Sequence, residues 1–151
     1  MNIKYLLLIA SAVVIAACSQ GPESPRGFSL PEGNVDAGKY VFKRYQCLAC
    51  HTIDGVEDDQ PQKHLSKPVK LGGEVSRVKT YAALMTSIIN PSHKIAPGYR
   101  TTGTTAEGKS KMPVYNDIMT VSELVDLVAF LQVQYEVKPE QYTHYNVYHI
   151  P

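Results

Sequence analysis

Apolar residues recur at helical spacing in three separate stretches of the chain. In the first they follow the i, i+3, i+4, i+7 pattern of one helix face, and the positions are Gly38, Val41, Phe42 and Tyr45. Either Asn34 or Asp36 is a suitable N-cap, so the pattern predicts a helix that starts there and runs into Cys47. Because glycine weakens a helix, we expect Gly38 to serve a close contact with another element.

The second stretch predicts a short helix from about Tyr81 to Ile89. Asn90-Pro91 ends it, because the residue before a proline disfavours helical backbone. The apolar stripe of this helix consists of Tyr81, Leu84, Met85, Ile88 and Ile89.

The third stretch predicts a helix that begins with a capping box formed by Thr120 and Glu123. Pro139 lies beyond its end. Its apolar stripe consists of Val121, Leu124, Val125, Leu127, Val128 and Leu131.

Two long tracts between these helices, residues 52–79 and 91–119, show neither helical periodicity nor a convincing strand. We therefore expect an all-α fold, a small domain of three main helices over residues 34–137 with long loops. A domain of this size buries only a modest apolar core, and long irregular loops are uncommon in compact domains. The loops are expected to wrap a bound group that completes the core.

The chain begins with the layout of a bacterial lipoprotein signal peptide, residues 1–17. A short basic start precedes an uncharged, mainly apolar run that closes with small residues before Cys18, as in a lipobox, in which the cysteine becomes lipidated. The alternative is an uncleaved membrane anchor. Residues 18–33, rich in Pro, Gly and Ser, predict a flexible linker, and residues 138–151 form a Tyr-rich tail.

The residues Cys47-Leu48-Ala49-Cys50-His51 form a C-x-x-C-H motif, the attachment signal for haem c. Each thiol adds to one vinyl group of a haem, and the histidine that follows lies against the iron. A structural zinc site requires further Cys or His ligands at short spacing, and a redox C-x-x-C is expected in a βαβ context; neither is found here. With Cys18 assigned to lipid, no cysteine remains for a disulfide, and a single motif predicts a single covalent haem.

The order of a C-x-x-C-H helix, a long loop, a middle helix, a Met-Pro pair and a last helix resembles class I monohaem cytochromes c of bacteria. The resemblance spans residues 34–135 and implies that Cys47 and Cys50 carry the haem thioethers, His51 is the proximal iron ligand and Met112 the distal one. It also implies an electron carrier rather than an enzyme. It pairs two residues of the first helix with two of the last, namely Gly38 and Phe42 with Leu127 and Phe130.

Other candidates for the distal ligand are Met85, Met119, His64 and His93. The resemblance further suggests that the carbonyl of Pro68 accepts the ring N–H of His51.

Charge is unevenly distributed along the chain. Residues 61–111 include nine basic and two acidic residues, whereas 18–60 include four and seven, and 112–151 one and five. An exported haem protein rarely meets nucleic acid, so we expect this basic block, with Lys109 and Lys111, to be a docking face for an acidic redox partner. An ordinary solvated surface is the alternative.

Together these features predict an exported carrier of single electrons between protein redox partners, held by lipid on Cys18 at the periplasmic side of a bacterial membrane. Ser19 after the lipidated cysteine favours the outer membrane over the inner one. Two alternatives remain open. One is a cytochrome subunit of a larger oxidase or periplasmic dehydrogenase, and the other is an open-site haem sensor or peroxidase-like protein.

Overall fold

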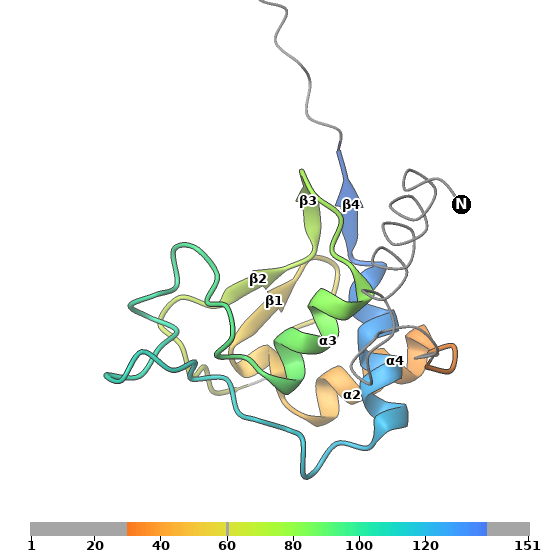
Figure 1. Cartoon of the computed structure of the whole chain (residues 1–151), viewed down its shortest axis with the longest axis horizontal. Helices are drawn as coiled ribbons and strands as arrows, with labels where there is room; N and C mark the ends of the chain where they lie inside the picture. Colours follow the sequence, from red (N-terminus) through yellow and green to blue (C-terminus); the bar gives the residue numbers. More distant parts are fainter. Residues whose placement is uncertain (1–29, 60, 139–151) are drawn as a thin grey trace, which may run out of the picture. The chain divides into compact units, whose positions relative to one another are not determined.

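The computed structural model describes residues 30–59 and 61–138, drawn in colour in Figure 1. Three α-helices cover the predicted stretches: α2 (Val35–Arg44), α3 (Tyr81–Ile89) and α4 (Val121–Gln132). Helix α4 packs against both α2 and α3. The mainly helical fold is thereby confirmed. The signal peptide, Cys18 and most of the linker and tail lie outside the described residues.

The crossing of α2 over α4 depends on a close approach of the two backbones. A Cβ atom on Gly38 would lie 2.0 Å from the backbone oxygen of Asp126 and 2.6 Å from the Cβ atom of Phe130. Next to this contact the rings of Phe42 and Phe130 pack with centroids 5.6 Å apart. The close contact expected at Gly38 is confirmed. Gly33, at the end of the predicted linker, also lies against α4.

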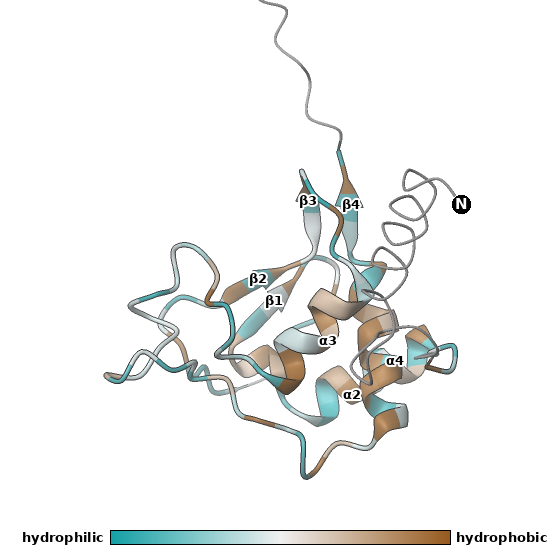
Figure 2. Ribbon diagram, viewed as in Figure 1, coloured by the Kyte–Doolittle hydropathy of each residue, from teal (hydrophilic) through white to brown (hydrophobic). Residues whose placement is uncertain are grey.

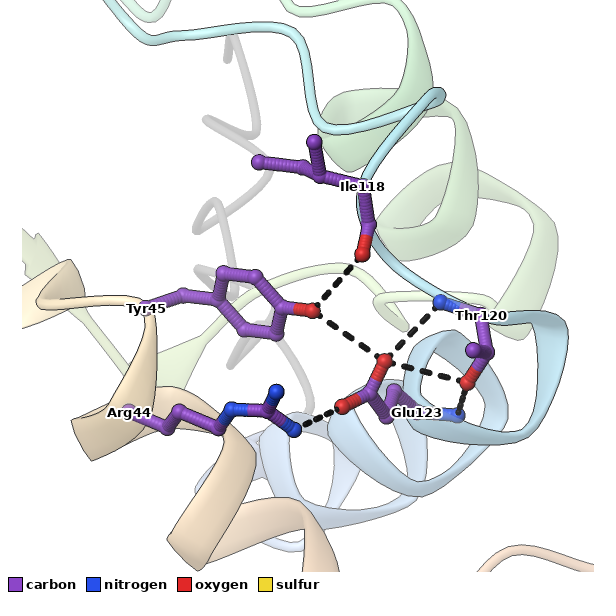
Figure 3. A network of polar contacts seen from close by, with 5 residues as sticks. All are labelled: Arg44, Tyr45, Ile118, Thr120 and Glu123. Atoms are coloured by element: carbon purple, nitrogen blue, oxygen red, sulfur yellow. Dashed lines mark hydrogen bonds and ion pairs between the residues drawn. The ribbon is translucent and has the colours of Figure 1, made fainter.

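Side-chain caps define where the helices begin. The Asn34 side chain accepts the Ala37 N–H at the start of α2, and Thr80 accepts the Ala83 N–H at the start of α3. At α4 the capping box of Thr120 and Glu123 is formed in both directions, as Figure 3 shows. These bonds satisfy N–H groups that have no partner within a helix.

The first helix does not run into Cys47, as the sequence pattern predicted. It ends at Arg44, and Gln46 adopts the left-handed backbone conformation with φ 54°. A separate 3-10 turn, η2 (Cys47–Ala49), then carries the first cysteine. The change of direction at Gln46 breaks the helical stripe before the C-x-x-C-H motif.

The described part of the chain also contains four three-residue strands, which were not predicted from the sequence. Strand β1 (His51–Ile53) pairs in parallel with β2 (Val69–Leu71), and β3 (Gly73–Val75) pairs in parallel with β4 (Tyr135–Val137). They bring parts of the long loop, and the chain after α4, into backbone contact. Strands this short hold too few positions for a two-residue alternation to be recognised.

The described core lies between the three helices. It includes Phe42, Leu84, Ile88, Leu127 and Phe130, which the predicted stripes and helix pairs contain. Figure 2 shows hydrophobic positions on α3 and α4 and mostly hydrophilic ribbon in the loops. Val121 departs from its predicted stripe, since it is 63% exposed. None of the described helices has the length and hydropathy needed to cross a membrane.

Candidate haem site

The C-x-x-C-H segment is held by backbone hydrogen bonds on both sides. The Cys50 N–H donates to the Cys47 carbonyl at 3.1 Å and closes the 3-10 turn. The Cys50 carbonyl accepts the Val69 N–H at 2.8 Å, and His51 stands opposite Val69 in the β1–β2 ladder. Lys63 Nζ also donates to the Leu48 carbonyl at 2.9 Å. The motif is thus held in place by hydrogen bonds from the loop that follows it. No sequence signal indicated that Lys63 would make one of these bonds.

A largely apolar cavity of about 350 Å³ adjoins this segment. Cys47, His51 and Met112 all line it, although Met112 lies far along the chain from the other two. Its apolar wall comes from all three helices and from β2, and includes Phe42, Leu71, Leu84, Ile88, Leu127 and Leu131. Apolar walls with a few convergent polar groups are typical of cofactor sites.

A neighbouring cavity of about 190 Å³ shares part of this lining. His51 and Met112 line both cavities, whereas Cys47 lines the first and Cys50 the second. The fold therefore brings together Cys47, Cys50, His51 and Met112 around two adjoining spaces. Cys18, the predicted lipidation site, lies outside the described residues.

Burial perturbs the ionisable groups of the motif. It raises the pKa of the Cys47 thiol to about 12. It also raises the pKa of the Cys50 thiol, while the positive charge of nearby Lys63 has the smaller effect of lowering it. Burial also lowers the pKa of His51, with the Val69 backbone acting in the opposite direction. Both cysteines are therefore held as thiols and His51 as a neutral imidazole, the form in which histidine binds a metal.

His51 Nδ1 is buried without a hydrogen-bond partner in the described part of the chain. A buried polar atom that lacks a partner costs free energy, so the imidazole is suited to a group that the chain itself does not provide. Two thiols, an imidazole and a thioether around an apolar space form the donor set that a covalently bound haem requires. The residues present therefore fit haem c.

Met112 is presented by a loop that is pinned through serines. The Met112 N–H donates to Ser110 Oγ, and the Ser110 N–H donates to Ser92 Oγ, each at 3.1 Å. The preceding Lys111 N–H donates to the Gly103 carbonyl at 2.9 Å. These bonds fix the backbone next to the candidate ligand, and no sequence pattern predicted them.

The competing methionines lie elsewhere. Met85 packs against the helical core, and Met119 lines a separate groove of about 220 Å³ beside α4. Neither lines the two cavities that contain His51. The arrangement therefore favours Met112 over both.

The loop histidines differ from each other. His64 is exposed and lines neither cavity, whereas His93 lines the larger one while its Nδ1 lies 2.8 Å from the Asn90 carbonyl. The predicted bond from the His51 ring to the Pro68 carbonyl is not formed by Nδ1, which has no partner in the described part of the chain, and the Pro68 carbonyl accepts a hydrogen bond of 3.3 Å from Tyr99 Oη. Tyr99 lines the smaller cavity and was not identified as a site residue from the sequence.

A family model for cytochrome c matches residues 35–134, about two thirds of the chain. The chain belongs to the cytochrome c family. Haem c is the covalent cofactor of this family, and Cys47 and Cys50 have the required spacing. Cytochromes c transfer electrons by means of their haem and exchange them with redox protein partners. Comparisons with curated proteins and with solved structures gave no match.

Proposed function

We propose that this cytochrome c is a membrane-tethered carrier of single electrons between exported redox proteins. The observation that supports this function is the convergence of Cys47, Cys50, His51 and Met112 on adjoining cavities. When bound, haem c supplies one-electron cycling between Fe(III) and Fe(II).

These four residues have two different roles in holding the cofactor. Cys47 and Cys50 would attach haem through thioether bonds, and His51 and Met112 would be the ligands of its iron. A neutral thioether and an imidazole favour the reduced state and raise the potential. With both ligands in place the iron would have no open position for a substrate, which distinguishes a carrier from an enzyme.

Carbon monoxide tests the assignment of Met112. We expect the visible spectrum of the ferrous protein to be unchanged by carbon monoxide, because Met112 holds the sixth position. Met112→Ala is expected to bind carbon monoxide, while Met119→Ala, a methionine that lines neither cavity, serves as the matched control. A shift in the unsubstituted protein would favour an open-site sensor or a peroxidase-like protein instead.

The tether is proposed to be lipid on Cys18, which would place the domain at the periplasmic side of a bacterial membrane, with the outer membrane favoured by Ser19. Residues 19–33, if extended at about 3.3 Å per residue, reach on the order of 50 Å from the lipid. That distance lets a small domain meet partners in turn. Cys18→Ala is expected to move the protein from the membrane fraction to the soluble fraction, whereas Ser19→Ala leaves it in the membrane.

The proposed partner presents an acidic face to the basic block. Lys79, Lys94 and Lys111 are exposed and also line the cavities, so positive charge lies where a partner would approach the haem. Affinity purification from the native membrane separates a free carrier from a complex subunit. Recovery of a stoichiometric oxidase or dehydrogenase would establish the subunit.

A further inference from the structure

Two tyrosines tie the segment after Met112 to the end of α2. Tyr45 lies two residues before Cys47, and Tyr115 lies three residues after Met112. Their rings pack edge to face, with centroids 5.5 Å apart and an interplanar angle of 72°. Tyr45 Oη donates to the Ile118 carbonyl at 3.0 Å, and Tyr115 Oη lies 3.5 Å from the Tyr45 carbonyl. Each tyrosine thus contacts the backbone of the other's segment, and we call this pair the tyrosine clip.

The α2 side of the tyrosine clip is anchored by an ionic network (Figure 3). Tyr45 Oη also lies 3.1 Å from Glu123 Oε2, and Arg44 Nη1 donates to Glu123 Oε1 at 2.5 Å. The same carboxylate accepts the Thr120 N–H at 2.9 Å in the capping box. The Glu123 carboxylate, near the start of α4, therefore contacts the Tyr45 hydroxyl and is itself held by Arg44 at the end of α2.

Two of the large apolar side chains in the segment on the other side are exposed. Val114 is 60% exposed and Ile118 is 63% exposed. The Met119 N–H closes a turn onto the Tyr115 carbonyl at 2.9 Å, and Asn116 Nδ2 donates to the Ile89 carbonyl at 3.1 Å. Because these aliphatic side chains face solvent, the segment is held by the tyrosine clip, by these hydrogen bonds and by Met119, which packs against the core.

We propose that Tyr45 and Tyr115 are positioning residues that keep Met112 at the distal position of the haem. This rests on the proposed role of Met112 as the distal ligand. Only Pro113 and Val114 separate Met112 from the clip, and on the preceding side Ser110 and Lys111 are pinned by hydrogen bonds. With both flanks fixed, Met112 cannot move far from the cavity without opening one of them.

The clip can be opened by small changes that retain both rings. Tyr45→Phe removes the hydroxyl bonds to Ile118 and Glu123, and Tyr115→Phe removes the bond to the Tyr45 carbonyl. Exogenous imidazole competes with Met112 for ferric iron, and its apparent affinity rises with the population in which Met112 has left. Loss of one hydrogen bond from the closed state corresponds to about a threefold to tenfold rise in that affinity.

The experiment is imidazole titration of the ferric, haem-loaded protein, together with loss of the methionine–iron charge-transfer band in urea. We expect each tyrosine variant to bind imidazole about threefold to tenfold more tightly. In both tyrosine variants, the methionine–iron band is expected to disappear at a lower urea concentration than the helical signal. In the unsubstituted protein the two transitions should coincide.

Two controls separate positioning from general stability. Tyr40→Phe makes the same chemical change on α2 at a side chain that is 68% exposed. Asn34→Ala removes the cap of α2 and lowers global stability without touching the clip. Both are expected to leave imidazole affinity unchanged. If the tyrosine variants behave like Asn34→Ala, the clip is merely structural and the inference is wrong. Absence of the methionine band from the unsubstituted protein would instead remove the assignment of Met112.

Discussion

At the scale of single residues, Gly38 shows how one missing side chain determines the crossing of two helices. A Cβ atom at this position would lie 2.0 Å from the backbone oxygen of Asp126 in α4. A backbone atom cannot rotate away as a side chain can. The same contact lets the Asn34 N–H donate to Asp126 Oδ1 at 2.7 Å. A glycine that would weaken an isolated helix is therefore favourable in this packed pair.

Gly38→Ala is accordingly expected to destabilise the haem-loaded protein by about 3 kcal/mol or more, as overpacked sites do. The gain in helix propensity, about 1 kcal/mol, does not offset the clash. Urea unfolding followed by the helical signal measures the change. Lys39→Ala, at the next and exposed position of α2, is the control and should unfold close to the unsubstituted protein. Equal stability of Gly38→Ala would show that the helices separate without cost.

At the scale of elements, the start of α4 joins helix capping to a longer network. Hydrogen bonds from the Thr120 backbone, then from the Thr120 and Tyr45 hydroxyls, and the charge of Arg44 hold the pKa of Glu123 below its ordinary 4.5, against a smaller opposing effect of burial. The ionised carboxylate therefore stabilises the folded state. Its contribution is fully present above the ordinary value and is lost as the pH falls through the lower folded-state pKa.

Glu123→Gln separates the charge of this carboxylate from its capping shape, because glutamine also accepts hydrogen bonds at this position. We expect the variant to be less stable than the unsubstituted protein at pH 6 to 7, and the difference to narrow as the pH falls below about 4.5. Urea unfolding at several pH values measures it. Glu136→Gln, at an exposed position of β4, is the control. A difference that stays constant with pH would contradict the role of charge.

The elements also show which parts of the fold were accessible from the sequence. The capping box at Thr120, the Asn90-Pro91 stop and the regular apolar stripes made α3 and the start of α4 predictable almost to the residue. The end of α2 was not predictable, because the left-handed backbone at Gln46 follows from tertiary packing rather than from a glycine signal. The parallel ladders depend on pairing between distant segments, which a local pattern does not record.

The residues of the candidate site likewise differ in how far the sequence predicted them. The C-x-x-C-H motif carries its chemistry in five adjacent residues, so Cys47, Cys50 and His51 could be named directly. Met112 needed the resemblance to a family, and only the fold shows that it shares cavities with His51. Tyr45 was recognised only as part of an apolar helix face, and Tyr115 and Tyr99 had no sequence signal, since these tyrosines donate to backbone carbonyls that a local pattern does not indicate.

At the scale of the whole molecule, the cavity opens to the surface but is walled by the helical core. Phe42, Leu84, Leu127 and Leu131 belong both to the core and to the cavity wall. A haem that occupies this space would remove these apolar side chains from water, which is favourable by about 25 cal/mol per Å² of apolar surface. The cofactor is therefore expected to be part of the fold.

A chain with Cys47→Ser and Cys50→Ser, which cannot form the thioether bonds, is expected to lose most of its stability in the absence of free haem. Circular dichroism and limited proteolysis measure the loss. Addition of haem should restore helical signal in part, through His51 and Met112, because a ligand that binds only the folded state stabilises it. A cooperative unfolding transition in the haem-free variant equal to that of the loaded protein would contradict this expectation.

The distribution of charge, rather than its total, is expected to govern the rate of electron exchange. The formal net charge is +1 at pH 7, too small to steer a partner by itself. Exposed Lys79, Lys94 and Lys111 nevertheless border the cavities. An anionic oxidant such as ferricyanide should therefore react more slowly as salt is added, since the screening length falls to about 10 Å at 0.1 M.

Lys94→Gln isolates this local field, because Lys94 lines both cavities. We expect this variant to react with ferricyanide severalfold more slowly than the unsubstituted protein at low salt. At high salt the two rates should be equal, because screening already cancels the attraction of Lys94 for the anion. Lys138→Gln is the matched control, as Lys138 pairs with Glu74 beside the β3–β4 ladder and lines neither cavity. Stopped-flow oxidation at several ionic strengths measures the rates of the unsubstituted protein and of the two variants. A rate that is independent of salt, or equal slowing by both substitutions, would mean that the basic block is a solvated surface and that another face meets the partner.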